Sequence, residues 1–397
     1  MFIGCIGDTH DVEERIIKDI VCNELLPRGV EVAIHTGDIE IQHVSAELFS
    51  NLPMTCVLTK QQSFDPDFSY APKNWRFVRP AYWKDKPEFI GKFTDELANA
   101  CVKELITFNE QQRIFCRLVP IKVDNEMVMA YCGHERSFDI FKNSQRVQEF
   151  FTEINQVYDG VRLAVSGHMH RQFIWRHGNL LWVNPGSIIE SMNRTREFAV
   201  VNTANWEVVC GRLTNAEAKI EPVTIGIISD TGNIDELDRS FWQRLKVEFD
   251  NRGVSYVICC GDFRPSDVGR LELANCQVYY YLLPEFASFP DPGPANWHRI
   301  SYDNPVIDIC GHQFYIQHEI GPEQANFSDI ERHCAFDEIR KRYKHLDFIV
   351  TGLVSDTIVQ EADKYFFINP GDAKDHRNFA TLCLPRSELT VGTVPDC

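Results

Sequence analysis

The chain of 397 residues is 44% hydrophobic and 24% charged, a composition typical of globular domains with a buried core. Its formal net charge of −17 argues against non-specific nucleic-acid binding, which needs a broad basic face, but leaves small phosphoesters and nucleotides open as substrates. No apolar stretch approaches the roughly 20 residues that cross a bilayer, so no membrane partner is expected. The opening residues lack the basic region of a signal peptide, and the fourteen cysteines show no paired spacing. We therefore expect a cytoplasmic protein with reduced thiols.

The first half of the chain alternates short apolar strands with helical stretches. Strands are predicted at Phe2–Ile6, Glu31–Ile34 and Met54–Leu58, and a helix at Val12–Leu26. Residues 63–118 read as an insertion that begins rich in proline and aromatic residues and ends in helices. Such an insertion serves either as a lid or as packing against a neighbouring domain. The alternation predicts an α/β architecture with function at the carboxyl ends of the strands.

The second half repeats this order of elements. A strand is predicted at Thr224–Ser229, a helix through Leu237–Asn251 and a strand at Val254–Cys260. We therefore predict two tandem domains, residues 1–219 and residues 220–397, with the boundary in a polar stretch that contains a proline.

Both halves also end in the same landmarks. A glycine that closes a predicted strand is followed, at the same spacing, by Asn-Pro-Gly; these are Gly167 with 184–186 and Gly352 with 369–371. The equal spacing predicts that the two domains are copies of one fold.

Five side chains in the first half could bind a metal ion. The carboxylates of Asp8 and Asp38 and the imidazoles of His10, His168 and His170 all follow predicted strands. Residues at positions i and i+2 of such a strand end can turn towards one point, as in Asp8-Thr9-His10. A mixed set of nitrogen and oxygen ligands suits Zn²⁺, Mn²⁺, Fe or Ni. The pattern therefore predicts a metal site in the first domain.

These motifs resemble those of the calcineurin-like metallophosphoesterases, in particular their small bacterial and archaeal phosphodiesterase branch. The resemblance covers most of residues 1–215 and rests on GDTH (7–10), HTGD (35–38), CGHE (132–135), SGHMH (166–170) and VNPGS (183–187). It implies that each copy is a two-layer β-sandwich flanked by helices. It also implies a centre of one or two divalent ions (Mn, Zn, Fe, Ni or Mg) at the strand ends of the first copy.

The resemblance also implies a role for each ligand. Asp8, His10 and His170 would hold the first metal, Asp38 would bridge the two metals, and His168 would belong to the second. A metal-activated hydroxide would attack phosphorus in line.

Two positions depart from the family pattern at the second metal. The expected asparagine ligand is Lys60 and the acidic position is Gln62, and a protonated lysine cannot bind a metal. Lys60 either supplies the positive charge of the missing ion or points into solvent. The expected ligand histidine is Cys132, so either its thiolate binds zinc or His134 reaches in and acts as the catalytic histidine.

Residues outside the ligand set have simpler interpretations. His35 is expected to be either a hydrogen-bonded core residue or a residue that supports the metal ligands without binding the ion, and residues 184–187 a structural turn. Arg194 and Arg196 either bind a substrate phosphate or lie on the solvated surface.

The second copy lacks most of the ligands. Leu353 and Ser355 stand where the first copy has its two strand-end histidines, and Gly232 stands in place of His10. We therefore expect a structural domain that packs beside the first, covers its cleft or offers a surface for homo-oligomerisation.

The sequence thus predicts metal-dependent hydrolysis of phosphomonoester or phosphodiester bonds in a small soluble substrate. The alternative is a non-catalytic pseudophosphatase, a ligand-binding or interaction module that keeps one metal site.

Overall fold

The computed structural model describes most of the two predicted halves. The described residues are 1–9, 12–37, 52–57, 74–78, 119–123, 126–131, 161–168, 170–189, 196–213, 221–229, 239–261, 273–281, 295–318, 338–352, 355–361, 365–373 and 376–395. The chain divides into two compact units. The first consists of Met1–Phe138, Gln148–Phe173 and Asn179–Thr203, and the second of Asp139–Val147, Ile174–Gly178 and Ala204–Cys397.

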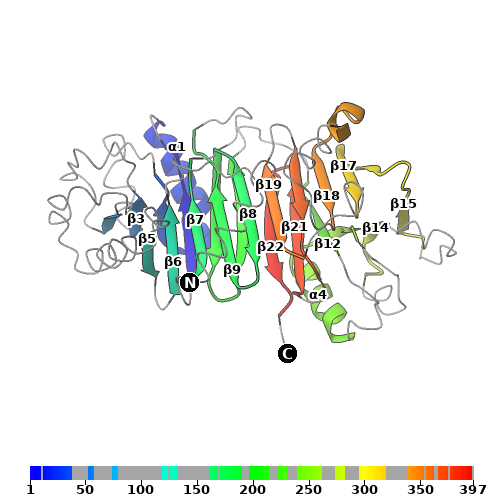
Figure 1. The fold of residues 1–397 in the computed structure, drawn as a ribbon, viewed down its shortest axis with the longest axis horizontal. Coiled ribbons are helices and arrows are strands. Elements are labelled where there is room, and N and C mark those ends of the chain that lie inside the picture. Colours follow the sequence, from blue (N-terminus) through cyan, green and yellow to red (C-terminus); the bar gives the residue numbers. More distant parts are fainter. Residues whose placement is uncertain are drawn as a thin grey trace, which may run out of the picture. The chain divides into compact units, whose positions relative to one another are not determined.

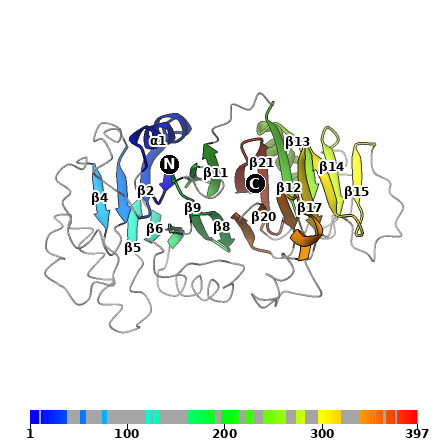
Figure 2. The ribbon, with the colours of Figure 1, turned by 90° about the horizontal axis from the view of Figure 1, so that it is seen from above.

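The first unit contains two layers of strands (Figure 2). In one layer, with the order β10-β1-β2-β3-β4, strands β1 to β4 are parallel and β10 is antiparallel to β1. In the other, with the order β5-β6-β7-β9, β5 is antiparallel to β6 and the rest are parallel. The bounds are β1 Phe2–Ile6, β2 Val30–His35, β3 Met54–Val57, β4 Trp75–Val78, β5 Val119–Val123, β6 Glu126–Tyr131, β7 Val161–Ser166, β9 Leu180–Pro185 and β10 Arg196–Asn202.

The predicted helix in the first unit is present, but it is not one regular α-helix. It begins as α1 (Glu14–Lys18), continues as the π-helix η1 (Asp19–Leu25) and ends as the 3-10 turn η2 (Leu26–Arg28). Most of its apolar side chains are buried, although Leu26 is exposed. Leu25 lies against β1 at Gly4, where a Cβ atom would come within 3.2 Å of it. The missing side chain therefore lets this helical segment approach the sheet closely.

The predicted insertion contains a strand of the sheet. Trp75–Val78 is β4, which pairs in parallel with β3. This segment is therefore partly sheet, and the sequence did not predict a strand in it. The rest of residues 63–118 lies outside the described residues. Among the described helices, none is long and apolar enough to cross a membrane.

The second unit also contains two groups of paired strands (Figure 1). Their orders are β15-β14-β13-β12-β21-β22-β11 and β16-β17-β18-β20-β19-β8. The bounds are β8 Gln172–His177, β11 Glu207–Leu213, β12 Val223–Ile228, β13 Val254–Cys259, β14 Gln277–Tyr281, β15 Trp297–Ile300, β16 Val306–Ile309, β17 His312–Gln317, β18 Phe348–Thr351, β19 Thr357–Glu361, β20 Phe366–Asn369, β21 Asn378–Leu384 and β22 Glu388–Thr393.

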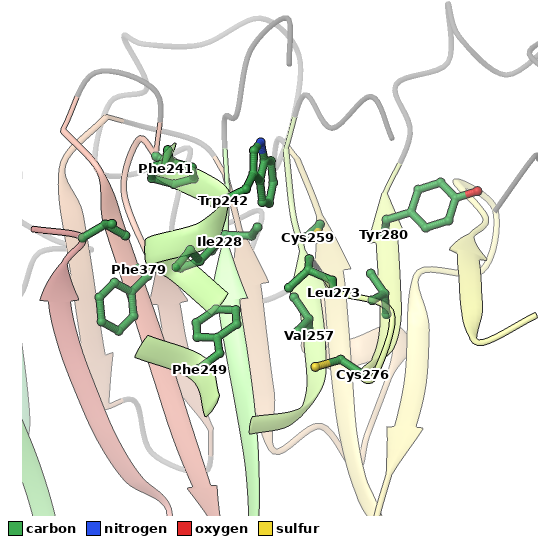
Figure 3. Close-up of a cluster of buried hydrophobic side chains, with 14 of the residues drawn as sticks. Ile228, Phe241, Trp242, Phe249, Val257, Cys259, Leu273, Cys276, Tyr280 and Phe379 are labelled. Atoms are coloured by element: carbon green, nitrogen blue, oxygen red, sulfur yellow. The ribbon is translucent and has the colours of Figure 1, made fainter. Parts of the chain in front are cut away.

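The helix α4 (Arg239–Asn251) covers β12 and β13 with its apolar face (Figure 3). Phe241, Trp242 and Phe249 are almost completely buried there. Phe249 occupies the space above Gly226 of β12, where a Cβ atom would come within 2.6 Å of its ring. The predicted helix is therefore confirmed over Arg239–Asn251, and the flanking strands are confirmed as β12 and β13.

The two units use the same strand order and the same register. The order β10-β1-β2-β3-β4 corresponds to β21-β12-β13-β14-β15, and β5-β6-β7-β9 corresponds to β16-β17-β18-β20. Even the local irregularity matches, because the pairing shifts between Phe2 and Ile3 in one unit and between Thr224 and Ile225 in the other.

Two strands of the predicted first domain, β8 and β11, contribute contacts to the second unit. On β11, Arg212 forms a buried ion pair with Glu361 of β19, with 2.7 Å between Nη2 and Oε1, and it lies over the Phe366 ring. On β8, the Trp175 indole N–H donates to the Asp356 carboxylate at 2.9 Å. These contacts join strands that are far apart in the sequence.

We expect an ion pair of the second unit, between His177 and Asp356, to stabilise it only in acidic and neutral solution. The imidazole Nδ1 lies 3.0 Å from the carboxylate. Hydrogen bonding to Asp356, the largest cause, raises the pKa of His177 above its ordinary value of 6.5. The contribution is therefore complete below that value and is lost as the pH rises through the higher folded-state pKa.

Because His177 is half exposed, screening by solvent limits this contribution to less than about 1 kcal/mol. His177→Asn should lower the free energy of unfolding at about pH 6 and leave it unchanged at about pH 9, as measured by chemical denaturation. An equal loss at both pH values would contradict the expectation, and the double variant with Asp356→Asn tests whether the two side chains act together.

Candidate metal centre

Asp8 lies at the carboxyl end of β1 with its side chain fully buried. Its backbone N–H donates to the Gly37 carbonyl at 3.2 Å, and its own carbonyl accepts from the Ser187 hydroxyl at 3.2 Å. Its carboxylate accepts the backbone N–H of His168, with the nitrogen 2.9 Å from Oδ2 and 3.2 Å from Oδ1. The loops that follow β1, β2 and β7 therefore meet at Asp8.

The two histidines after β7 lie beside Asp8. The Nε2 atom of His170 is 3.8 Å from Asp8 Oδ1, and the His170 side chain is 41% exposed. The two imidazole rings stand nearly perpendicular, with centroids 6.4 Å apart. The structure therefore brings Asp8, His168 and His170 close together, and their role as metal ligands stays a prediction.

The backbone at these three residues is unusual. Asp8, His168 and His170 have φ angles of +49°, +70° and +50°. Residues other than glycine rarely adopt this left-handed backbone region, and a strained residue there costs about 1–3 kcal/mol. Such conformations persist when the surroundings hold them, and they concentrate at functional sites. Here they turn two side chains with metal-binding groups towards each other.

Two glycines allow the loops to approach so closely. The Thr36 side chain fills the space between them, because a Cβ atom at either Gly7 or Gly167 would lie 2.5 Å from its hydroxyl. The Thr36 N–H donates to the Ile6 carbonyl at 3.0 Å, which fixes the loop after β2 against the end of β1. The loops that begin at Gly7 and Gly167 are thereby packed against a common residue.

The Asn-Pro-Gly segment is the structural turn that the sequence predicts. The Asn184 side chain accepts the Gly186 N–H at 3.0 Å and donates to the Gly167 carbonyl at 3.2 Å. Gly186 has a φ of +84°, which a glycine adopts without strain. The turn thus holds the β7 loop in place, and through the Ser187 hydroxyl it also holds Asp8.

His35 is the buried, hydrogen-bonded residue that the sequence predicts. Its Nδ1 accepts the Gly37 N–H at 3.3 Å, so this nitrogen carries no proton. In the neutral ring the Nε2–H then donates to the Thr9 hydroxyl, at 3.2 Å. The imidazole therefore connects the loop that carries Asp8 with the loop that precedes Asp38.

Several predicted site residues lie outside the described part of the chain: His10, Asp38, Lys60, Cys132, His134 and Arg194. Their predicted roles stay predictions. Within the described ranges, no group of three His, Cys, Asp or Glu side chains is placed to hold a metal ion. Arg196 begins β10 and is partly buried; the next residue, Glu197, donates its N–H to the Ser187 carbonyl at 3.0 Å.

The described part of the donor set fits a divalent ion. Asp8 offers an oxygen and His170 a nitrogen, and their separation of 3.8 Å is smaller than twice a typical zinc–ligand distance of about 2.1 Å. One cation can therefore contact both atoms. Burial of a carboxylate is costly unless a positive charge or hydrogen bonds compensate it, and a bound cation would supply that charge.

The sequence did not identify Thr36 and Ser187 as parts of the site. The only signals for them are the glycines that precede Asp8 and His168, which indicate a close approach without showing which side chain makes it. The cysteines in the described residues are free thiols, and burial raises the pKa of Cys5, beside the site on β1, to about 12.

Comparison with known proteins places the first half of the chain in a family. The family model of the calcineurin-like phosphoesterase superfamily domain matches residues 1–205. No curated protein matches the chain.

Solved structures that match include an archaeal phosphodiesterase, with 18% identity, a TM-score of 0.32, and coverage of 54% of this chain and 100% of the other. A protein from Streptococcus pneumoniae described as a predicted phosphoesterase matches with 17% identity, a TM-score of 0.30 and coverage of 54% and 88%. Vps29 from Entamoeba histolytica, complexed with zinc, matches with 13% identity, a TM-score of 0.32 and coverage of 56% and 96%.

Proposed function

Because the chain belongs to the calcineurin-like phosphoesterase superfamily, a family of metal-dependent phosphoester hydrolases, we propose that it hydrolyses a phosphomonoester or phosphodiester bond of a small soluble substrate. The first domain, residues 1–219, carries the reaction, and the second, residues 220–397, is structural. A nucleotide is one such substrate, and the cytoplasm is the proposed location.

One observation carries this proposal. The buried carboxylate of Asp8 and the imidazole of His170, from strand ends that are far apart in the sequence, lie 3.8 Å apart on strained backbone. The fold by itself does not require a buried carboxylate next to a histidine with a left-handed backbone conformation. In the sequence, the proposed ligand His10 follows β1, as Asp8 does, and the proposed ligand Asp38 follows the neighbouring strand β2.

A divalent ion bound here would polarise a phosphoryl oxygen and lower the pKa of a coordinated water. The chain's own residues hold this centre rigid. Asp8 is fixed through its carboxylate, its N–H and its carbonyl, so its position changes little when a substrate binds. His170 is partly exposed and therefore lies on the side that a substrate can reach. We propose that His134 acts on the leaving group, that Lys60 supplies the positive charge of the missing second ion, and that the arginines at 194 and 196 bind the phosphate.

We further propose that the second domain arose by duplication of the first and lost its metal site. The shared strand order and the shared register shift support this history. The retained glycines support it too, since Gly371 repeats the left-handed conformation of Gly186 with a φ of +85°. A copy that keeps only the fold can serve as a packing partner or as a surface for a homo-oligomer.

The activity is tested with a panel of substrates and metals. Purified, metal-stripped protein should hydrolyse an aryl phosphate or a cyclic nucleotide after addition of Mn²⁺ and should lose this activity with a chelator. The metal content of the protein as isolated, measured by mass spectrometry, gives the number of ions. Tight metal binding without turnover of any substrate would instead favour the pseudophosphatase alternative, and the absence of both would contradict the proposal.

A further inference from the structure

The imidazole of His35 connects two loops behind the candidate metal centre, and the proposed function gives this residue no role. It ends β2 and is 1% exposed. Its two ring nitrogens bond to the Thr9 hydroxyl, directly after Asp8, and to the Gly37 N–H, directly before Asp38. Each hydrogen-bond partner of His35 is therefore adjacent in the sequence to a proposed metal ligand.

The second unit shows the same strand end without a histidine. Ile6 of β1 pairs with His35, and Ile228 of β12 pairs with Cys259, so the two residues occupy equivalent positions. Cys259 is buried in the hydrophobic cluster under α4 (Figure 3). A thiol cannot accept one N–H and donate to a hydroxyl at the two separate points that an imidazole reaches.

The fold of this strand and loop does not depend on the histidine. The backbone bond after it is the same in both units: Thr36 N–H donates to the Ile6 carbonyl at 3.0 Å, and Cys260 N–H to the Ile228 carbonyl at 2.9 Å. The histidine is present in the unit that keeps the ligand residues and absent from the unit that has lost them. The two hydrogen bonds of His35 are therefore found where the ligand residues are present, and the sheet forms without them.

We propose that His35 is a positioning residue of the metal centre, which fixes the Asp8 loop and the Asp38 loop relative to each other through Thr9 and Gly37. This inference rests on the proposed function. Groups that orient metal ligands from behind typically change metal affinity by about 10–100-fold when they are removed. His35 acts on the loops that carry the ligands and does not itself bind the ion.

The test is the affinity of metal-stripped full-length protein for Mn²⁺ alone, measured by titration calorimetry. His35→Cys, which copies the residue of the second unit, should weaken Mn²⁺ binding by about 10–100-fold. His35→Asn keeps an acceptor for the Gly37 N–H, and His35→Gln keeps a donor for Thr9, so each should restore part of the affinity. His177→Asn, which removes a histidine of the second unit, serves as the control and should bind as the wild type does.

Thermal unfolding without metal shows whether each variant folds. If His35→Cys does not fold, Thr9→Val, which removes one hydrogen bond at nearly constant volume, replaces it and should still weaken Mn²⁺ binding. Folded variants that bind Mn²⁺ within twofold of the wild type would overturn the positioning role alone. A wild-type protein that neither binds Mn²⁺ nor hydrolyses a phosphoester would overturn the proposed function and this role together.

Discussion

Asp8→Asn is expected to lower phosphoester turnover by more than about 100-fold, the upper range for groups that only orient metal ligands. The substitution removes the buried negative charge but keeps a side-chain oxygen that can accept the His168 N–H. The loop around residue 8 therefore keeps its hydrogen bond, and the loss reports on the charge alone. The measurement is kcat/KM on an aryl phosphate with added Mn²⁺.

The same substitution should not lower the stability of the metal-free protein, although it should abolish most of the activity. Without metal, the wild-type protein keeps a carboxylate in a fully buried position, which costs desolvation energy. Asp8→Asn should therefore melt at or above the wild-type temperature in chelator, yet gain nothing from Mn²⁺, whereas the wild type gains stability by mass action. A variant that keeps its activity, or that Mn²⁺ stabilises as much as it does the wild type, would contradict the role of Asp8 as a ligand. A variant that melts below the wild type in chelator would contradict the expected stability.

The glycines of the two Asn-Pro-Gly turns should be equally intolerant of substitution. Gly186 and Gly371 have φ angles of +84° and +85°. A Cβ atom would lie 2.7 Å from the Glu197 Cβ in the first turn and 2.6 Å from the Asn378 Nδ2 in the second. The left-handed conformation costs alanine about 1–2 kcal/mol, and overpacking adds about 1–3 kcal/mol. Either substitution should thus cost about 2–5 kcal/mol in chemical denaturation.

Two other glycines separate backbone strain from crowding. Gly178 and Gly253 have φ angles of +53° and +65°, but a Cβ atom there would meet nothing within 4 Å. Alanine at these positions should cost only about 1–2 kcal/mol. If Gly371→Ala cost no more than Gly253→Ala, the turn of the second unit would be a relaxed remnant rather than a packed part of its fold.

Much of the fold could be predicted from the sequence because its strongest signals are local. The apolar strands β1, β2, β3, β12 and β13 begin and end within one residue of the predicted bounds. Each is a short apolar run, and all but β3 are followed within two residues by a Gly or Asp. This pattern can be recognised in the sequence without any knowledge of tertiary contacts.

The sequence could not predict features that depend on tertiary contacts. β4 consists of four residues in a segment rich in proline and aromatic residues, and it is defined by pairing with β3. The π-helix at Asp19–Leu25 buries the same apolar side chains that an α-helix would, so its hydrophobic spacing does not reveal it. The division of strands between the two units likewise follows from packing.

For the candidate site, the ligand residues could be predicted from the sequence, but the residues that hold them in place could not. Asp8, His168 and His170 stand out as ligand types at strand ends. The Thr36 side chain between two glycines, and the Ser187 hydroxyl on the Asp8 carbonyl, involve residues that are common on protein surfaces. These two residues come close to Asp8 only in the folded protein.

The membership of β11 in the second unit limits how the protein can be divided. A fragment that starts at residue 220 would contain Glu361 but not Arg212, whose guanidinium is its buried partner. Loss of one member of a buried ion pair leaves the other charge uncompensated. Because the chain enters the second unit at residues 174–178, returns to the first, and leaves it again after residue 203, no single cut yields two complete units. Gene fission or recombination at one point would damage both units, and this favours inheritance of the two units as one polypeptide.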